Sequence, residues 1–231
     1  MSFELVTILD VCLSSANVAF ALAAAWALCR SGKVCSYPLL LLFFLISPAF
    51  NIIFTSNMFL GFLDRAYYGR LYWANELVEQ GFAMAMMVCV MRFALAGERS
   101  SAILSQGLAS VAVVLVAALL TEGSPSFGSL WMTGFTRNLS FGVALMNFQV
   151  WGLLLGRRVK SREILLLASG LGLLTTGKSL GHTIRIVAEP GGWAELCGNY
   201  LVVATSILAA YVWWSAFRPA SKKTLTLVKA A

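Results

Sequence analysis

Seven long stretches of apolar residues occupy almost the whole chain, and this feature limits the possible fold more than any other. They cover approximately residues 5–28, 37–60, 68–95, 102–120, 133–156, 164–187 and 193–217. Each stretch is close to the length of about 20 residues that a helix needs to cross the hydrocarbon core of a membrane. We therefore predict an all-α membrane protein with seven transmembrane helices and a single membrane domain over residues 1–231.

The composition agrees with burial in lipid. Hydrophobic residues make up 59% of the chain and charged residues 12%, against about 45–50% and about 25% in soluble domains. The short connections leave no length for a soluble catalytic or nucleic-acid-reading domain. A lipid bilayer is the expected environment, and the net charge of +7 is not attributed to a nucleic-acid partner.

Basic residues are distributed unevenly between the two sets of connections. Twelve of the seventeen lysines and arginines follow spans one, three, five and seven: Arg30, Lys33, Arg92, Arg99, Arg157, Arg158, Lys160, Arg162, Arg218, Lys222, Lys223 and Lys229. Because cytoplasmic loops are enriched in lysine and arginine, we predict that the N-terminus lies outside and the C-terminus in the cytoplasm. An odd number of spans also requires the two termini to lie on opposite sides.

Several ionisable residues lie inside the predicted spans, where each costs at least about 2.5–3.5 kcal/mol on insertion scales and suggests function by default. In the sixth span, Lys178, His182 and Arg185 are spaced at i, i+4 and i+7 and so share one helix face. The candidate site residues are Asp10, Arg70, Trp73, Glu76, Glu79, Arg137, Lys178, His182 and Arg185.

Counting residues from the span ends places these groups at similar depth. With a rise of about 1.5 Å per residue, Glu76 lies roughly 12 Å and Lys178 roughly 13–14 Å below the outer ends of their spans. Asp10 and Arg137 also fall in the outer half. Amides add polar groups at middle or outer depth: Asn17, Asn51, Asn75, Gln80, Asn138 and Asn199. We therefore expect the helices to enclose a polar cavity near the outside.

Three interpretations of this cluster remain open. In the first, Glu76 or Glu79 pairs with Arg137 or Lys178 only to fix the helix register, and such a pair is weak evidence for stability. In the second, the cluster forms a pocket for a small ligand or ion. In the third, the carboxylates belong to a proton or ion pathway.

We recognise no catalytic or metal-binding motif, so we predict no catalytic residue, no metal site and no enzymatic activity. His182 is the one histidine, which excludes haem ligation by two histidines within the chain, and we expect it to be hydrogen-bonded near the interface. The five cysteines are scattered without a CxxC, which argues against a disulfide framework or a zinc site. Any other cofactor is left unknown.

Two glycine pairs have the spacing that permits close contact between membrane helices. They are Gly152-x-x-x-Gly156 in the fifth span and Gly177-x-x-x-Gly181 in the sixth. Because this spacing is common inside single membrane domains, we interpret both pairs as intramolecular packing rather than as dimerisation surfaces.

The number of spans is similar to that of the microbial rhodopsins. The run Arg70-x-Tyr72-Trp73-x-x-Glu76 resembles the arginine, aromatic residue and carboxylate of that family's third helix. That family attaches retinal to a lysine midway along its seventh helix. Residues 201–210 of this chain contain no lysine, and Lys178 lies one helix earlier. Retinal is therefore not expected, and the resemblance is rejected.

Four further features follow one another along the chain: Arg30, Tyr37-Pro38, Arg65-x-Tyr67-Tyr68-x-x-Leu71-Tyr72-Trp73-x-x-Glu76, and the basic segment 157–162. Together they are similar to a group of small bacterial seven-helix membrane proteins that has no assigned activity. The resemblance implies a bacterial protein, and with the predicted topology a multi-pass protein of the cytoplasmic (inner) membrane. It transfers no functional residue.

The absence of a soluble domain and of a catalytic motif favours a non-catalytic function. The first expectation is an accessory or structural subunit of a larger membrane complex, with other membrane subunits or a second copy of the chain as partners. One alternative is a receptor or carrier that uses the outer polar pocket for a small ligand. A second alternative is an ion or proton pathway.

Overall fold

The computed structural model describes residues 3–94, 100–119, 130–189 and 192–218. These residues form seven α-helices: α1 (Phe3–Arg30), α2 (Pro38–Leu60), α3 (Arg65–Ala94), α4 (Ser100–Leu119), α5 (Leu130–Gly156), α6 (Arg162–Val187) and α7 (Trp193–Phe217). No strand occurs in these ranges. The predicted all-α fold is confirmed. Four of the basic residues that entered the topology argument lie outside the described residues: Arg99, Lys222, Lys223 and Lys229.

Helix length and composition make this a membrane protein. Five helices, α1, α2, α5, α6 and α7, are long and apolar enough to cross a membrane. The other two are α3, which has 30 residues and includes Arg70, Glu76 and Glu79, and α4, whose stretch Ser105–Leu119 is a shorter apolar helix. At about 1.5 Å per residue α3 is about 45 Å long, which exceeds the thickness of the hydrocarbon core.

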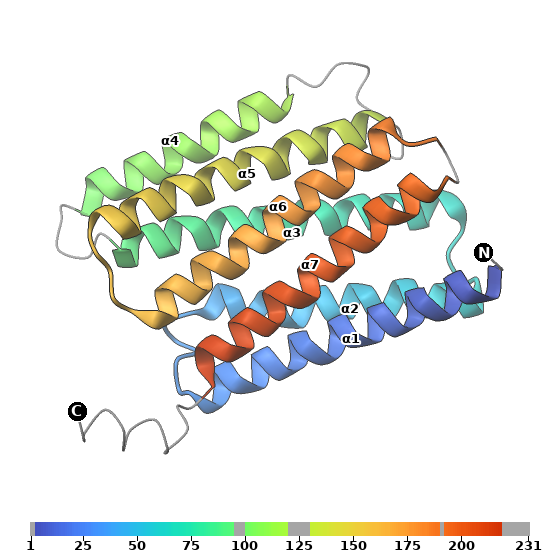
Figure 1. The fold of residues 1–231 in the computed structure, drawn as a ribbon, viewed down its shortest axis with the longest axis horizontal. Helices are drawn as coiled ribbons and strands as arrows, with labels where there is room; N and C mark the ends of the chain where they lie inside the picture. The colour runs from blue at the N-terminus through green and yellow to red at the C-terminus, as the bar shows by residue number, and fades with distance from the viewer. Residues whose placement is uncertain (1–2, 95–99, 120–129, 190–191, 219–231) are drawn as a thin grey trace.

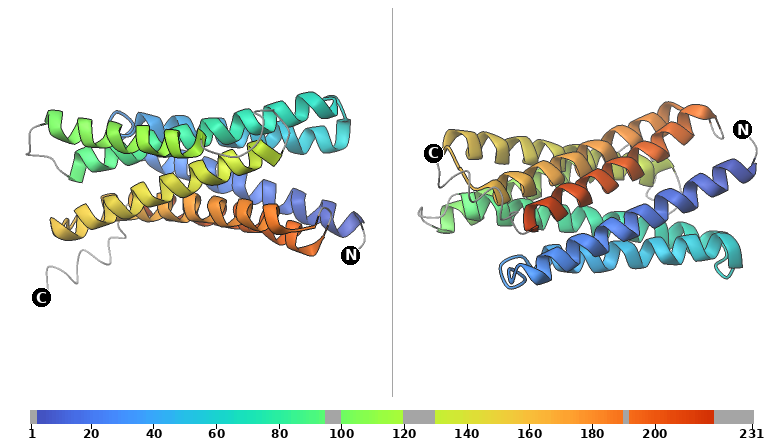
Figure 2. Two further views of the ribbon diagram at one scale, coloured as in Figure 1. Left: turned by 90° about the horizontal axis from the view of Figure 1, so that it is seen from above. Right: turned by 60° about the horizontal axis from the view of Figure 1, so that its bottom comes forward.

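Five of the helices form a closed ring. They pack against one another in the order α1, α2, α3, α6 and α7, and α7 returns to pack against α1. Outside the ring, α5 packs on α3 and α6, and α4 packs on α5 and α3 (Figure 1). Two further views show that all the helices run roughly lengthwise along the molecule (Figure 2). We call the end at which α1 and α7 begin the N-side, and the end at which they finish the C-side.

An aromatic layer fills the ring toward its C-side. The indole of Trp213 on α7 lies 5.7 Å from the ring of Phe43 and 5.6 Å from that of Phe44 on α2, measured between centroids. Its Nε1–H donates to the carbonyl of Leu167 on α6 at 3.2 Å. Gly170 leaves the space for the indole, because a Cβ there would collide with it. We call Phe43, Phe44 and Trp213 the aromatic floor.

Glycines bring α6 and α7 close together. A Cβ added to Gly181 would lie 2.7 Å from the carbonyl oxygen of Gly198, and one added to Gly177 would collide with Thr205. The interpretation of Gly177 and Gly181 as packing residues is therefore confirmed. It is wrong for the other glycine pair, because no described atom lies within 4 Å of a Cβ built at Gly152 or Gly156.

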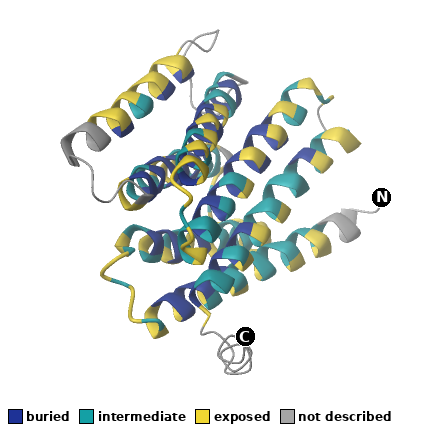
Figure 3. Cartoon of the chain, turned by 60° about the vertical axis from the view of Figure 1, so that its left-hand side comes forward, coloured by how far each residue is buried: buried dark blue, intermediate teal, exposed yellow. Residues whose placement is uncertain are grey.

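The outer helix α4 contrasts with the ring helices in its exposure. Exposed residues cover much of its surface (Figure 3), and they include Val113 at 68% and Leu119 at 65% exposure. Large exposed apolar side chains are expected where lipid takes the place of water. The polar residues that matter for a site lie inside the ring instead.

Candidate functional site

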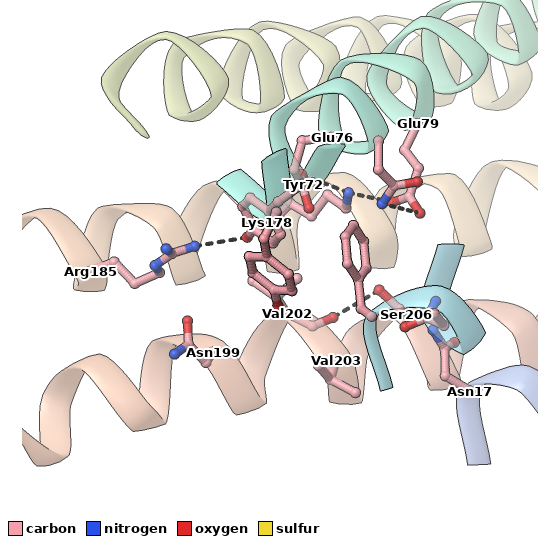
Figure 4. A pocket seen from close by; sticks show the side chains of 14 residues that line it. Asn17, Tyr72, Glu76, Glu79, Lys178, Arg185, Asn199, Val202, Val203 and Ser206 are labelled. Carbon is pink, nitrogen blue, oxygen red and sulfur yellow. Dashed lines mark hydrogen bonds and ion pairs between the residues drawn. The ribbon is translucent and has the colours of Figure 1, made fainter. Parts of the chain in front are cut away.

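A buried ion-pair cluster joins α3 to α6 inside the ring. The ammonium Nζ of Lys178 donates to Glu76 Oε2 at 2.9 Å and to Glu79 Oε2 at 2.5 Å. The two carboxylates are three residues apart and so lie on the same face of α3. Lys178 is only 2% exposed, and Figure 4 shows its side chain extending toward both carboxylates. The predicted pairing with Lys178 is present, and one ammonium bridges two carboxylates.

The second oxygen of Glu79 is also bonded. Glu79 Oε1 accepts a hydrogen bond from Ser47 Oγ of α2 at 3.0 Å and one from Asn75 Nδ2 at 3.4 Å. Buried polar groups in folded proteins are nearly always hydrogen-bonded, because an unpaired one costs its full desolvation energy. Glu79 therefore ties α2, α3 and α6 together at one point.

Arg185 and a group of three aromatic rings lie nearer the N-side than the ion-pair cluster does. Arg185 of α6 donates from Nη1 to the hydroxyl of Tyr72 at 2.9 Å, and its guanidinium lies 5.8 Å from the centre of the same ring. The ring of Phe54 on α2 contacts those of Tyr72 and Tyr68 at 6.1 and 5.3 Å. The guanidinium is held in place by one hydrogen bond and a cation–π contact.

His182 differs from the prediction. It is completely buried, and its Nε2 lies 3.6 Å from Glu76 Oε2, beyond hydrogen-bond distance. Neither ring nitrogen has a hydrogen-bond partner among the described residues. The expectation that this histidine is hydrogen-bonded is therefore wrong, and its place near the interface stays a prediction.

These groups surround a pocket inside the ring. Its volume is about 380 Å³, and it receives residues from all five ring helices. The lining residues are Asn17, Asn51, Phe54, Tyr68, Tyr72, Asn75, Glu76, Glu79, Lys178, Arg185, Asn199, Val202, Val203 and Ser206. On the C-side of Glu79 lies a smaller cavity of about 30 Å³, and the aromatic floor is part of its lining. A polar cavity is therefore present inside the ring, and the aromatic floor lies on its C-side.

Glu76, Glu79, Lys178 and Arg185 of the predicted site line this pocket. Two others lie beside it. Trp73 is buried, with its ring 5.0 Å from that of Tyr72. Asp10 of α1 is close enough to Tyr68 and Tyr200 to interact with them electrostatically.

Arg70 and Arg137 are not part of the pocket. Arg70 is exposed on α3, with its guanidinium 6.0 Å from the ring of Tyr67. Arg137 lies on α5, outside the ring, and donates to Asn138 Oδ1 from Nε at 3.1 Å and from Nη2 at 2.9 Å. The alternative in which Arg137 neutralises a glutamate of α3 is therefore not observed.

The prediction missed the aromatic part of the pocket. Tyr68 and Tyr72 precede Glu76 by eight and four residues, and this spacing places the three side chains on one helix face. The sequence thus held a signal for both tyrosines. Phe54 offered no comparable signal, because apolar residues occur on several faces of α2. Asn17, Asn51, Asn75 and Asn199, four of the amides expected near a cavity, do line the pocket.

The charges that line the pocket cancel. Glu76 and Glu79 supply two negative charges, and Lys178 and Arg185 supply two positive ones. In the described part of the chain no group of three or more His, Cys, Asp or Glu side chains is placed to hold a metal ion. Comparison with protein-family models, with curated proteins and with solved structures gave no match to the chain.

Proposed function

We propose that the protein is a membrane receptor or carrier that holds a small zwitterionic ligand in the pocket inside the five-helix ring. One observation carries the proposal: the ion-pair cluster borders a cavity of about 380 Å³. This volume falls within the range of about 300–1,000 Å³ typical of small-molecule sites. An ion pair that only fixes helix register needs no cavity beside it.

The balance of charges supports a zwitterion as the ligand class. A ligand with one net charge would leave an uncompensated charge in a site shielded from water, which is costly. The ammonium group of such a ligand would bind the carboxylates of Glu76 and Glu79. Its carboxylate would bind the guanidinium of Arg185, because a guanidinium binds a carboxylate through two parallel hydrogen bonds. Free amino acids are small ligands that carry both groups.

Thermal unfolding of the purified protein with individual free amino acids at millimolar concentration tests this proposal. We expect at least one of them to raise the melting temperature, because a ligand present at 100 times its Kd stabilises the folded state by about 2.7 kcal/mol. Arg185→Gln should weaken that ligand at least about tenfold, since a hydrogen bond to a charged group contributes about 1.5–3 kcal/mol.

Arg70→Gln is the matched control, because it removes an exposed charge of the same kind outside the pocket. We expect its ligand affinity to equal that of the unaltered protein. Two results would contradict the proposal: no amino acid shifts the melting temperature, or Arg70→Gln weakens binding as much as Arg185→Gln does.

We further propose seven membrane spans in a bacterial inner membrane, with the N-side outside. The charges of α3 support this arrangement, because Glu76 and Glu79 face Lys178 inside the ring and not lipid. The basic ends of α1 and α7, at Arg30 and Arg218, support a cytoplasmic C-side. Under this topology the pocket is reached from outside.

The ion or proton pathway is less well supported than the ligand pocket. The small cavity beyond Glu79 is lined by the polar residues Asn17, Ser47 and Ser206 and by apolar or aromatic residues on its C-side. Among the described residues that line it, Glu79 is the one ionisable side chain. Proton flux into liposomes should therefore be the same for Glu79→Gln and the unaltered protein. A large loss of flux in Glu79→Gln would favour the pathway instead.

The accessory-subunit role stays a prediction. Exposed apolar side chains such as Val113 and Leu119 suit contact with lipid as well as contact with another subunit. The mass of the protein extracted in a mild detergent separates the two cases. A complex containing other chains would support the accessory role, and a lone copy would count against it.

A further inference from the structure

A second pocket lies at the C-side, far from the first along the bundle. It has a volume of about 410 Å³ and lies between the end of α1, the connection that follows it and the end of α7. Its lining residues are Arg30, Ser31, Lys33, Ala216, Phe217 and Arg218. Three of the six are basic, and no acidic residue is among the described residues that line the pocket.

Only one of these cations is neutralised by a carboxylate. Lys33 forms an ion pair with Glu163 at the start of α6, and burial together with the neighbouring Glu163 raises the pKa of Tyr37 beside it. Arg30 and Arg218 form no ion pair with any described residue. Within the described part of the chain, two guanidinium groups are therefore available to an anion.

Each of these arginines follows a tryptophan by one helical turn. Trp26 precedes Arg30 by four residues on α1, so the two share a side of that helix. Trp214 precedes Arg218, the residue directly after α7, by four residues, and the backbone N–H of Arg218 donates to the carbonyl of Trp214. The guanidinium of Arg218 lies 5.1 Å from the centre of the Trp214 ring. Trp26 is 69% exposed. The arginines thus lie about 6 Å beyond the tryptophans along the helix axes.

This arrangement matches the layers of a membrane surface. Tryptophan is enriched where the acyl chains meet the headgroups, and a group about one helical turn further out lies among the headgroup phosphates. Arginine binds phosphate through two parallel hydrogen bonds. Basic pockets between membrane helices bind anionic lipid headgroups.

We propose that the C-side pocket binds the phosphate of an anionic phospholipid, with Arg30 and Arg218 as the phosphate ligands and Trp26 and Trp214 against the glycerol and upper acyl chains. The exposed indole of Trp26 favours a lipid over free phosphate, because inorganic phosphate has no apolar part to cover it. This site is separate from the pocket inside the ring and does not depend on the function proposed for that pocket.

Titration of the delipidated full-length protein in a neutral detergent tests the site. The probes are short-chain phosphatidylglycerol, phosphatidylcholine of the same chain length and inorganic phosphate, and native mass spectrometry and the melting temperature report binding. We expect phosphatidylglycerol to bind in preference to the other two. Arg30→Gln and Arg218→Gln should each weaken it about fivefold, since one basic residue at a membrane surface contributes about that factor.

Arg162→Gln is the control, because Arg162 is exposed at the same end of the bundle but does not line the pocket. Its affinity for phosphatidylglycerol should be unchanged. Equal losses in all three variants, or no loss in Arg30→Gln and Arg218→Gln, would overturn the proposal. Equally strong binding of inorganic phosphate would overturn the assignment to a lipid, and equally strong binding of phosphatidylcholine would overturn the requirement for an anionic one.

Discussion

Lys178→Met is expected to lower the free energy of unfolding by about 3–5 kcal/mol, the usual cost of breaking a buried ion pair by removing one partner. The variant keeps the apolar stem of the lysine and leaves Glu76 and Glu79 facing each other without the ammonium that bridges them. Unfolding in mixed micelles by a denaturing detergent, followed by circular dichroism, measures the loss.

Two further variants separate the loss of the ion-pair cluster from the loss of a lysine as such. Lys160→Met removes a lysine that is exposed near the start of α6, and it should change stability by no more than about 0.5 kcal/mol. The triple variant Glu76→Gln, Glu79→Gln, Lys178→Met should recover most of the loss, because it leaves no unpaired charge. A triple variant whose loss equals the sum of the single losses would show that the three residues do not interact.

Gly181→Ala is the second large effect that we expect, a loss of about 3 kcal/mol at the upper end of the range for overpacking. The added Cβ would lie 2.7 Å from the carbonyl oxygen of Gly198, which belongs to the backbone of α7 and cannot rotate away. The two helices must separate to admit the methyl group. The same micelle unfolding measurement gives the magnitude.

Gly152→Ala is the matched control for this substitution. It adds the same methyl group to a glycine with no described atom within 4 Å of the new Cβ. Because alanine is the better helix former by about 1 kcal/mol, the control should be neutral or slightly stabilising. Similar losses at both positions would contradict close packing of α6 on α7 as the cause.

The sequence predicted the helices well because the signal is physical and local. A run of apolar residues long enough to span a membrane has few alternatives to a helix in lipid. The boundaries follow turn signals such as Pro38 at the start of α2 and Gly61, which ends it with a positive φ of 59°. The largest differences are in α3 and α5, which begin at Arg65 and Leu130 rather than near residues 68 and 133.

The sequence predicted that Glu76 and Lys178 lie at the same level of the bundle, but it did not predict the complete membership of the site. Counting residues along a helix gives the height of Glu76 and Lys178 in the membrane, and the structure brings these two together. Counting residues does not give the direction in which a side chain points. In a membrane helix both the lipid face and the core face are apolar, so a periodic pattern does not reveal which face is inward.

Arg137 illustrates this limit. By depth alone it is as good a partner for the glutamates as Lys178, but the order of helices in the ring places α5 outside. That order depends on contacts between distant parts of the chain, such as α6 with α7 and α1 with α7. No local feature of residues 133–156 indicates it.

The ring also constrains how the protein is made. Glu76 and Lys178 are separated by 102 residues, and at about 5–20 residues per second the ribosome adds the lysine about 5–20 s after the glutamate. During that interval α3 has been synthesised and the ammonium that will neutralise its carboxylates has not. The interval is longest for α1, because its partner α7 is the last helix to be synthesised and the ring closes only when the two pack together. Under the proposed seven-span arrangement, we therefore expect failures of membrane insertion to concentrate between the synthesis of α3 and that of α6.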